Sequence, residues 1–191
     1  MGAKALNTDL LDRAIIFAVR AHAGTERRGK GFPYIVHPME AVEIVASMTD
    51  DQHLLAAAVL HDTVEDTPTT VEQIRGEFGD RIAALVAEES DQFPEGLSEE
   101  ESWLGRKQAA IKRLSEASHD AKVVALGDKL SNMRAISRDY AVKGDELWNI
   151  FHVKDKALHA WHYRGLVEAL RELEGTFAFA EFEQLVNKVF G

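Results

Sequence analysis

The sequence contains no cysteine, and this absence excludes three kinds of chemistry. Without a thiol there is no disulfide, no thiolate metal site and no cysteine nucleophile. The chain also lacks an N-terminal apolar run of the signal-peptide kind and any apolar stretch long enough to span a bilayer. These absences predict a cytoplasmic protein with no membrane partner.

An excess of positive charge is missing as well. The chain has 22 Lys and Arg against 32 Asp and Glu, which gives a formal net charge of -10. Proteins that bind nucleic acid usually carry a basic footprint, so we expect no nucleic-acid partner. The local exception is the segment Arg27-Arg28-Gly29-Lys30. By itself it is more typical of a solvated basic loop, but arginines can also stack on a base and pair with phosphate.

Repeats, low-complexity stretches, linkers and clear β-strands are absent too, and helical patterning dominates. The length of 191 residues suits one domain, which we expect to span residues 1–191. Apolar residues at helical spacing and capping signals predict an all-α bundle. The expected helices cover about residues 10–19, 39–48, 52–64, 71–78, 79–90, 98–117, 145–174 and 179–190, and a further helix carries the core stripe Val123, Leu126, Leu130 and Met133. A capping box is expected from Thr69 and Glu72. A loop is expected over 21–38 and a turn at 94–97.

Four residues form the most informative pattern of the chain. His61 and Asp62 are adjacent on the predicted helix 52–64, His37 lies upstream and Asp128 downstream. Two imidazoles and two carboxylates suit Mn²⁺, Fe²⁺ or Zn²⁺ better than Ca²⁺ or Mg²⁺, which prefer oxygen ligands alone. A buried Asp128 would also need a partner. The pattern therefore indicates hydrolysis assisted by one divalent ion of this group.

Glu65 and Asp66 follow this pair by one helical turn and could act on the attacking water. They are expected near a helix C-terminus, where a negative charge is unfavourable because it opposes the helix dipole. Two consecutive acids at such a position hint at function. The competing interpretation is a pair of solvated surface acids. The remaining histidines receive a structural interpretation: His22, His53, His119, His152, His159 and His162.

These residues belong to three longer strings, and together the strings resemble a known family. They are Ala21-His22 leading to Pro33-Tyr34-Ile35-Val36-His37-Pro38, then Ala57 to Thr67, and then Leu126-Gly127-Asp128-Lys129-Leu130-Ser131-Asn132-Met133-Arg134. Their order and spacing resemble the HD-domain hydrolases of the Rel/SpoT superfamily. In size the chain is similar to the small stand-alone alarmone hydrolases, and the resemblance covers most of residues 8–190.

The resemblance implies an all-helical HD-type fold that holds one metal, usually Mn²⁺, at the positions matching the four ligands above. It implies that Glu65 and Asp66 handle the attacking water. The implied reaction removes the 3′-pyrophosphate from (p)ppGpp, giving GDP or GTP and pyrophosphate. The implied substrate-binding residues are Arg27, Arg28, Tyr34 and Asn132. The implied domain is a hydrolase alone, with no synthetase or regulatory part.

Some positions depart from the family pattern, and alternatives stay open. Arg28 stands where Lys is usual, Ala125 where many relatives have Lys, and Trp103 near the place of a basic residue that lines the site. One alternative is an HD-type phosphatase acting on another nucleotide, such as an NADPH 2′-phosphatase or a nucleoside monophosphatase. Another is a non-catalytic nucleotide sensor. The sequence leaves homo-oligomerisation open.

Overall fold

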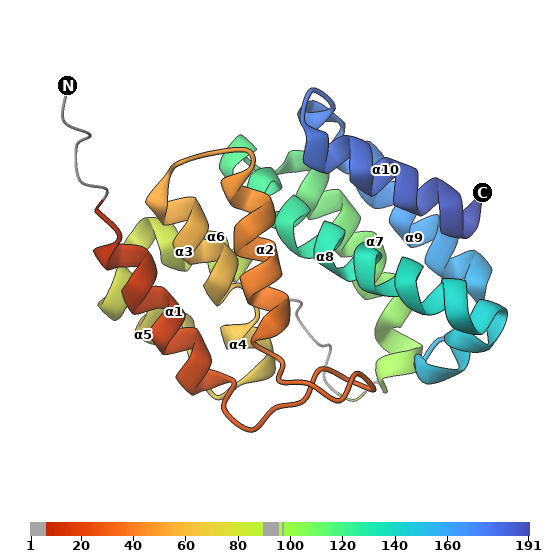
Figure 1. Cartoon of the computed structure of the whole chain (residues 1–191), viewed down its shortest axis with the longest axis horizontal. Helices are drawn as coiled ribbons and strands as arrows, with labels where there is room; N and C mark the ends of the chain where they lie inside the picture. Colours follow the sequence, from red (N-terminus) through yellow and green to blue (C-terminus); the bar gives the residue numbers. More distant parts are fainter. Residues whose placement is uncertain (1–6, 90–95, 97) are drawn as a thin grey trace. The chain divides into compact units, whose positions relative to one another are not determined.

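The computed structural model describes residues 7–89, 96 and 98–191, and in these residues the protein is built from helices without a β-strand (Figure 1). An isolated bridge between Glu26 and Pro33 is the one β-type pairing recorded there. The predicted all-α class is therefore confirmed. The turn predicted at 94–97 lies outside the described residues except for Gly96.

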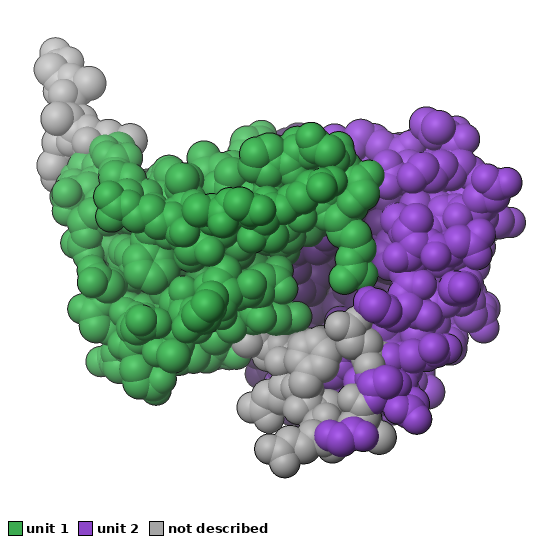
Figure 2. Space-filling model, turned by 90° about the horizontal axis from the view of Figure 1, so that it is seen from below, with its two compact units in different colours: residues 1–90 green, residues 91–191 purple. Residues whose placement is uncertain are grey.

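The chain divides into two compact units, residues 1–90 and 91–191, and Figure 2 colours them separately. The expectation that residues 1–191 act as a single HD-type domain stays a prediction. None of the described helices is both long enough and apolar enough to cross a membrane.

The first unit is organised around one buried helix. Residues Leu54–Leu60 of α3 (Gln52–Leu60) are all buried. A helix that is apolar on every side needs neighbours on every side, and α3 packs against α1 (Asp9–Ala21), α2 (Val36–Ala46) and α6 (Asp80–Glu89). The short helices α4 (Thr63–Asp66) and α5 (Val71–Phe78) link α3 to α6. The core of the unit thus lies directly behind the segment that carries His61 and Asp62.

The second unit is organised around α8 (His119–Lys143), its longest helix. The predicted stripe of Val123, Leu126, Leu130 and Met133 is buried, as expected from its helical spacing. α10 (Phe177–Phe190) packs along α8, while α7 (Glu99–Glu116) packs mainly on α9 (Lys156–Ala169). The region predicted as one helix over 145–174 is instead the 3₁₀ segment η1 (Gly144–Ile150), α9 and the short turn η2 (Arg171–Leu173).

Two predicted helix boundaries are wrong near the candidate site. α2 begins at Val36 rather than Met39, so His37 lies in its first turn. Pro38 is tolerated there because N–H groups of a first turn have no partner within the helix. The helix predicted over 52–64 ends at Leu60, and α4 starts at Thr63. The capping box expected from Thr69 and Glu72 is formed one residue later, by Thr70 and Gln73.

We predict a measurable cost from removing the N-cap of α8. The Ser118 hydroxyl accepts a hydrogen bond from the Ala121 N–H at 3.2 Å. Ser118→Ala should lower the free energy of unfolding by about 1 kcal/mol, and Ser118→Asp should restore it, since Asp caps as well as Ser. Denaturant titration measures this change, and Ser115→Ala, at an exposed position of α7, is the control. Equal stability of the Ala and Asp variants would contradict this role of Ser118.

Candidate metal and catalytic site

The turn between α3 and α4 places His61 and Asp62 outside regular helix. Asp62 has φ -91° and ψ -2°, a sparsely populated backbone region in which active-site residues are often found. The Thr63 hydroxyl donates to the Leu60 carbonyl at 2.7 Å, which competes with continuation of the helix. This bend explains why helical periodicity alone placed the pair wrongly on one continuous helix.

Two imidazole rings meet one carboxylate oxygen at this turn. The Nε2 atoms of His61 and His37 lie 2.9 Å and 3.4 Å from Asp62 Oδ2. Both histidines are buried, and their ring centroids are 5.1 Å apart. The structure therefore brings together three of the four predicted ligands, all within the first unit.

The backbone fixes the protonation of the His61 ring. Its Nδ1 lies 2.7 Å from the Ala58 carbonyl oxygen. A carbonyl oxygen only accepts, so Nδ1 carries the proton and Nε2 presents a lone pair in the neutral ring. Such a hydrogen bond from the second ring nitrogen is the usual support of a histidine that binds metal.

The donor set passes a simple test of fit for a cation. In the neutral tautomer, His61 Nε2 and Asp62 Oδ2 are two electron-rich atoms 2.9 Å apart. This approach is favourable when a proton or a positive ion lies between them. Two imidazole nitrogens and a carboxylate match the preferences of Mn²⁺, Fe²⁺ and Zn²⁺. The cluster suits a divalent metal ion.

Tyr34 also belongs to this cluster. Its hydroxyl donates to Asp62 Oδ2 at 2.6 Å, and its ring lies 5.8 Å from the His37 ring. Burial, together with the negative charges of Asp62 and Asp66, raises the pKa of Tyr34 well above its usual value. The hydroxyl therefore remains a donor at neutral pH. Tyr34 was predicted to line the substrate pocket, and that role stays a prediction.

The two predicted catalytic acids lie on α4, one turn beyond Asp62. The Asp66 N–H donates to the Asp62 carbonyl at 2.9 Å, which continues the helical winding. Glu65 and Asp66 are both exposed as residues. Even so, incomplete hydration of the carboxyl group is the largest reason that the pKa of Asp66 is raised, and the charge of Asp62 adds to it. A carboxylate with a raised pKa is a stronger base.

The basic loop before α2 is closed by its own hydrogen bonds. The Arg27 N–H donates to the Phe32 carbonyl at 3.0 Å, and the Tyr34 N–H donates to the Thr25 carbonyl at 2.8 Å. Gly29, with φ 66°, allows the tight reversal between them. The Arg27 guanidinium lies 5.3 Å from the centre of the Tyr34 ring. Arg27 is thus held beside the cluster, whereas Arg28 is exposed.

The fourth predicted ligand, Asp128, lies on α8 of the second unit and is buried. Lys129 Nζ donates to its Oδ2 and Asn132 Nδ2 to its Oδ1, each at 2.5 Å. The buried carboxylate is therefore compensated within its own helix. Participation of Asp128 as a ligand and of Asn132 as a nucleoside contact both stay predictions.

Two of the three departures from the family pattern, Ala125 and Trp103, lie in the interior of the second unit. Ala125 is fully buried on α8. Trp103 is buried on α7, with its ring 5.4 Å from the His159 ring and 5.9 Å from the His162 ring. An apolar residue at each position therefore packs in the helical core.

One residue of the first unit was missed by sequence reasoning. His22, at the C-terminus of α1, was assigned a structural role, yet its ring lies 4.9 Å from the Tyr34 ring. Its place in the same sequence string as Tyr34 and His37 was the signal that could have identified it.

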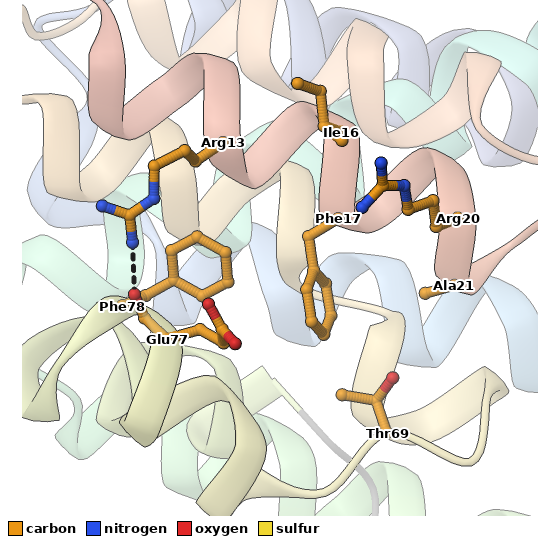
Figure 3. A pocket seen from close by; sticks show the side chains of 8 residues that line it. All are labelled: Arg13, Ile16, Phe17, Arg20, Ala21, Thr69, Glu77 and Phe78. Carbon is orange, nitrogen blue, oxygen red and sulfur yellow. Dashed lines mark hydrogen bonds between the residues drawn. The ribbon is translucent and has the colours of Figure 1, made fainter.

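The surface hollow in Figure 3 is a different feature: its volume is about 550 Å³, and it contains none of the predicted site residues. It is lined by Arg13, Ile16, Phe17, Arg20, Ala21, Thr69, Glu77 and Phe78.

Comparison with known proteins shows the family to which the chain belongs. Residues 14–153 match the HD domain family model. The chain is 34% identical over 137 residues to the guanosine-3′,5′-bis(diphosphate) 3′-pyrophosphohydrolase MESH1 of Danio rerio, covering 69% of this chain and 72% of that protein. It is 37% identical over 139 residues to the GTP pyrophosphokinase rsh of Brucella ovis, covering 69% of this chain but only 17% of that longer protein.

A solved structure extends the likeness to the fold. It is described as a metazoan ortholog of SpoT that hydrolyzes ppGpp, and it matches with a TM-score of 0.70 at 22% identity. The match covers 98% of this chain and 97% of that one. The resemblance drawn from the three sequence strings is confirmed. The chain belongs to the HD-domain family and, within it, to the group that includes the MESH1 pyrophosphohydrolases.

Proposed function

We propose that this chain is a metal-dependent guanosine-3′,5′-bis(diphosphate) 3′-pyrophosphohydrolase, which converts ppGpp or pppGpp to GDP or GTP and pyrophosphate. The observation that carries the proposal is the convergence of two imidazole nitrogens on Asp62 Oδ2, with acids one helical turn away. The relatives that are named for this hydrolysis support the choice of substrate.

The proposed metal ligands are His37, His61, Asp62 and Asp128, and the proposed ion is Mn²⁺, with Fe²⁺ or Zn²⁺ as replacements. A bound divalent ion would polarise a phosphoryl oxygen and lower the pKa of water. The hydrogen bond from His61 Nδ1 to the Ala58 carbonyl keeps Nε2 free of a proton for this purpose.

The proposed chemistry is one hydrolytic displacement. Glu65 or Asp66 accepts a proton from the attacking water, whose oxygen bonds to the phosphorus attached to O3′. The O3′–P bond breaks, O3′ takes up a proton, and pyrophosphate leaves. Arg27 and Arg28 are proposed to hold the guanine and phosphate groups, since a planar guanidinium both stacks and forms paired hydrogen bonds. Asn132 is proposed to contact the nucleoside.

Product analysis of the purified protein with Mn²⁺ and ppGpp tests this proposal. We expect GDP and pyrophosphate in equal amounts, lost on treatment with a chelator and restored by Mn²⁺. NADPH and nucleoside monophosphates serve as competing substrates in parallel reactions. Intact ppGpp, with phosphate released from one of the other nucleotides, would move the assignment to a different substrate of the same site.

A further inference from the structure

A tyrosine contacts a carboxylate of the candidate site, and a buried histidine contacts that tyrosine. The ring centroids of Tyr34 and His22 are 4.9 Å apart with the planes inclined by 34°. The Tyr34 hydroxyl donates to Asp62 Oδ2 at 2.6 Å, and the negative charge of Asp66 acts on Tyr34 together with that of Asp62. One hydroxyl thus contacts a proposed metal ligand and lies within electrostatic range of a proposed base.

The ring nitrogens of His22 are both buried, and they hydrogen-bond to no atom of the described protein. The residue is only 3% exposed. A neutral imidazole offers one N–H donor and one acceptor. Leaving both unsatisfied is costly for buried groups, so these nitrogens require a partner outside the described part of the protein.

The surroundings of His22 indicate where that partner lies. Burial lowers the pKa of His22, and the negative charges of Asp62 and Asp66 act in the opposite direction. The ring therefore favours its neutral form, and it lies within electrostatic range of Asp62, which Tyr34 contacts, and of Asp66. A water molecule can bridge such groups, because the position is polar on both sides.

We propose that Tyr34 and His22 are a pair of positioning residues for the hydrolysis. The Tyr34 hydroxyl fixes Asp62 in the orientation that faces the two histidines. The His22 ring supports Tyr34 from behind, and its nitrogens hold a water molecule against Asp62 and Asp66. This inference rests on the proposed function but adds to it, because it gives a role to a histidine that the ligand set and the base pair do not use.

The contribution of Tyr34 is tested by Tyr34→Phe, which keeps the ring and removes the hydroxyl. We expect Mn²⁺ affinity, measured by titration calorimetry, to fall roughly 10- to 100-fold, the usual effect of losing the support of a metal ligand. The matched control is Tyr140→Phe, which removes a hydroxyl that donates to Asp145 in the second unit at 3.1 Å. Unchanged Mn²⁺ affinity in Tyr34→Phe would overturn this part of the inference.

The contribution of His22 is tested by two variants. His22→Phe keeps an aromatic ring against Tyr34 but removes both nitrogens, whereas His22→Asn keeps a donor and an acceptor. We expect His22→Phe to lower kcat for ppGpp roughly 10- to 100-fold with little change in KM, and His22→Asn to recover part of the loss. His53→Phe, at an exposed position in the first turn of α3, is the control. Equal kcat values in the Phe and Asn variants would show that the nitrogens have no role.

The metal titration separates this inference from the proposed function. Tyr34→Phe is compared with the unmodified protein in Mn²⁺ binding alone, without any nucleotide. If the unmodified protein leaves ppGpp intact, the proposed function fails, but a loss of Mn²⁺ affinity in Tyr34→Phe still supports the positioning of Asp62. If ppGpp is hydrolysed and both variants behave as the unmodified protein, the positioning pair fails alone.

Discussion

Asp62→Ala should remove Mn²⁺ binding and ppGpp hydrolysis together, with a fall in kcat/KM of at least about a thousandfold. Asp62 Oδ2 is the oxygen on which both Nε2 atoms converge, at 2.9 Å from His61 and 3.4 Å from His37. Its removal leaves the two imidazoles without the negative charge that a divalent ion needs beside them. Calorimetric titration with Mn²⁺ and product analysis measure the two losses.

The position of Asp62 between α3 and α4 makes a folding control necessary. Asp62→Asn keeps an acceptor for the Tyr34 hydroxyl but removes the charge, so it should retain the helical circular dichroism and bind Mn²⁺ weakly. Asp50→Ala, at an exposed position before α3, should behave as the unmodified protein. Full activity in Asp62→Ala, or activity that survives complete removal of divalent metal, would refute the metal site.

Much of the fold could be predicted because helical patterning is a local property. The stripe from Val123 to Met133 and the apolar run from Leu54 to Leu60 are both buried, as their sequences require. The bend after Leu60 could not be predicted from periodicity. It depends on the Thr63 hydroxyl donating to a carbonyl of the preceding turn, which is a choice between two hydrogen bonds of similar strength.

The residue types of the candidate site could be predicted from sequence, but the hydrogen bonds that orient these side chains could not. His37, His61 and Asp62 were identified from chemistry and spacing, and they lie together in the first unit. The hydrogen bond from His61 to the Ala58 carbonyl depends on ring orientation, which sequence does not encode locally. The same holds for Tyr34, whose hydroxyl reaches a carboxylate 28 residues away in the sequence.

His22 illustrates what tertiary structure adds to a histidine that the sequence assigns a structural role. A lone histidine near a helix end is usually a satisfied structural residue, and this one ends α1 as its C-cap. Its interest comes from burial without a hydrogen-bonding partner, and burial depends on tertiary packing. Asp128 is the converse case, since its burial between apolar neighbours was expected and is observed.

Glu65→Gln should leave Mn²⁺ binding intact and slow turnover of ppGpp by about 10²-fold or more. Glu65 is exposed on α4, so the change to a neutral side chain of the same shape should leave stability unaltered. What is lost is the negative charge that accepts a proton from water. Glu72→Gln, in the first turn of α5, is the matched control because it changes the charge at a nearby exposed position.

The pH dependence of turnover then decides how the two acids share the task. A base works as the carboxylate, so activity is present above its pKa and is lost as the pH falls through it. The pKa of Asp66 is raised above its usual value, so an acid limb governed by Asp66 lies at higher pH than one governed by an ordinary carboxyl group.

If Asp66 is the base, Glu65→Gln keeps this limb and Asp66→Asn removes it together with most of the turnover. If Glu65 is the base, Glu65→Gln removes the limb, and unchanged kcat in that variant would exclude Glu65 from the proton transfer.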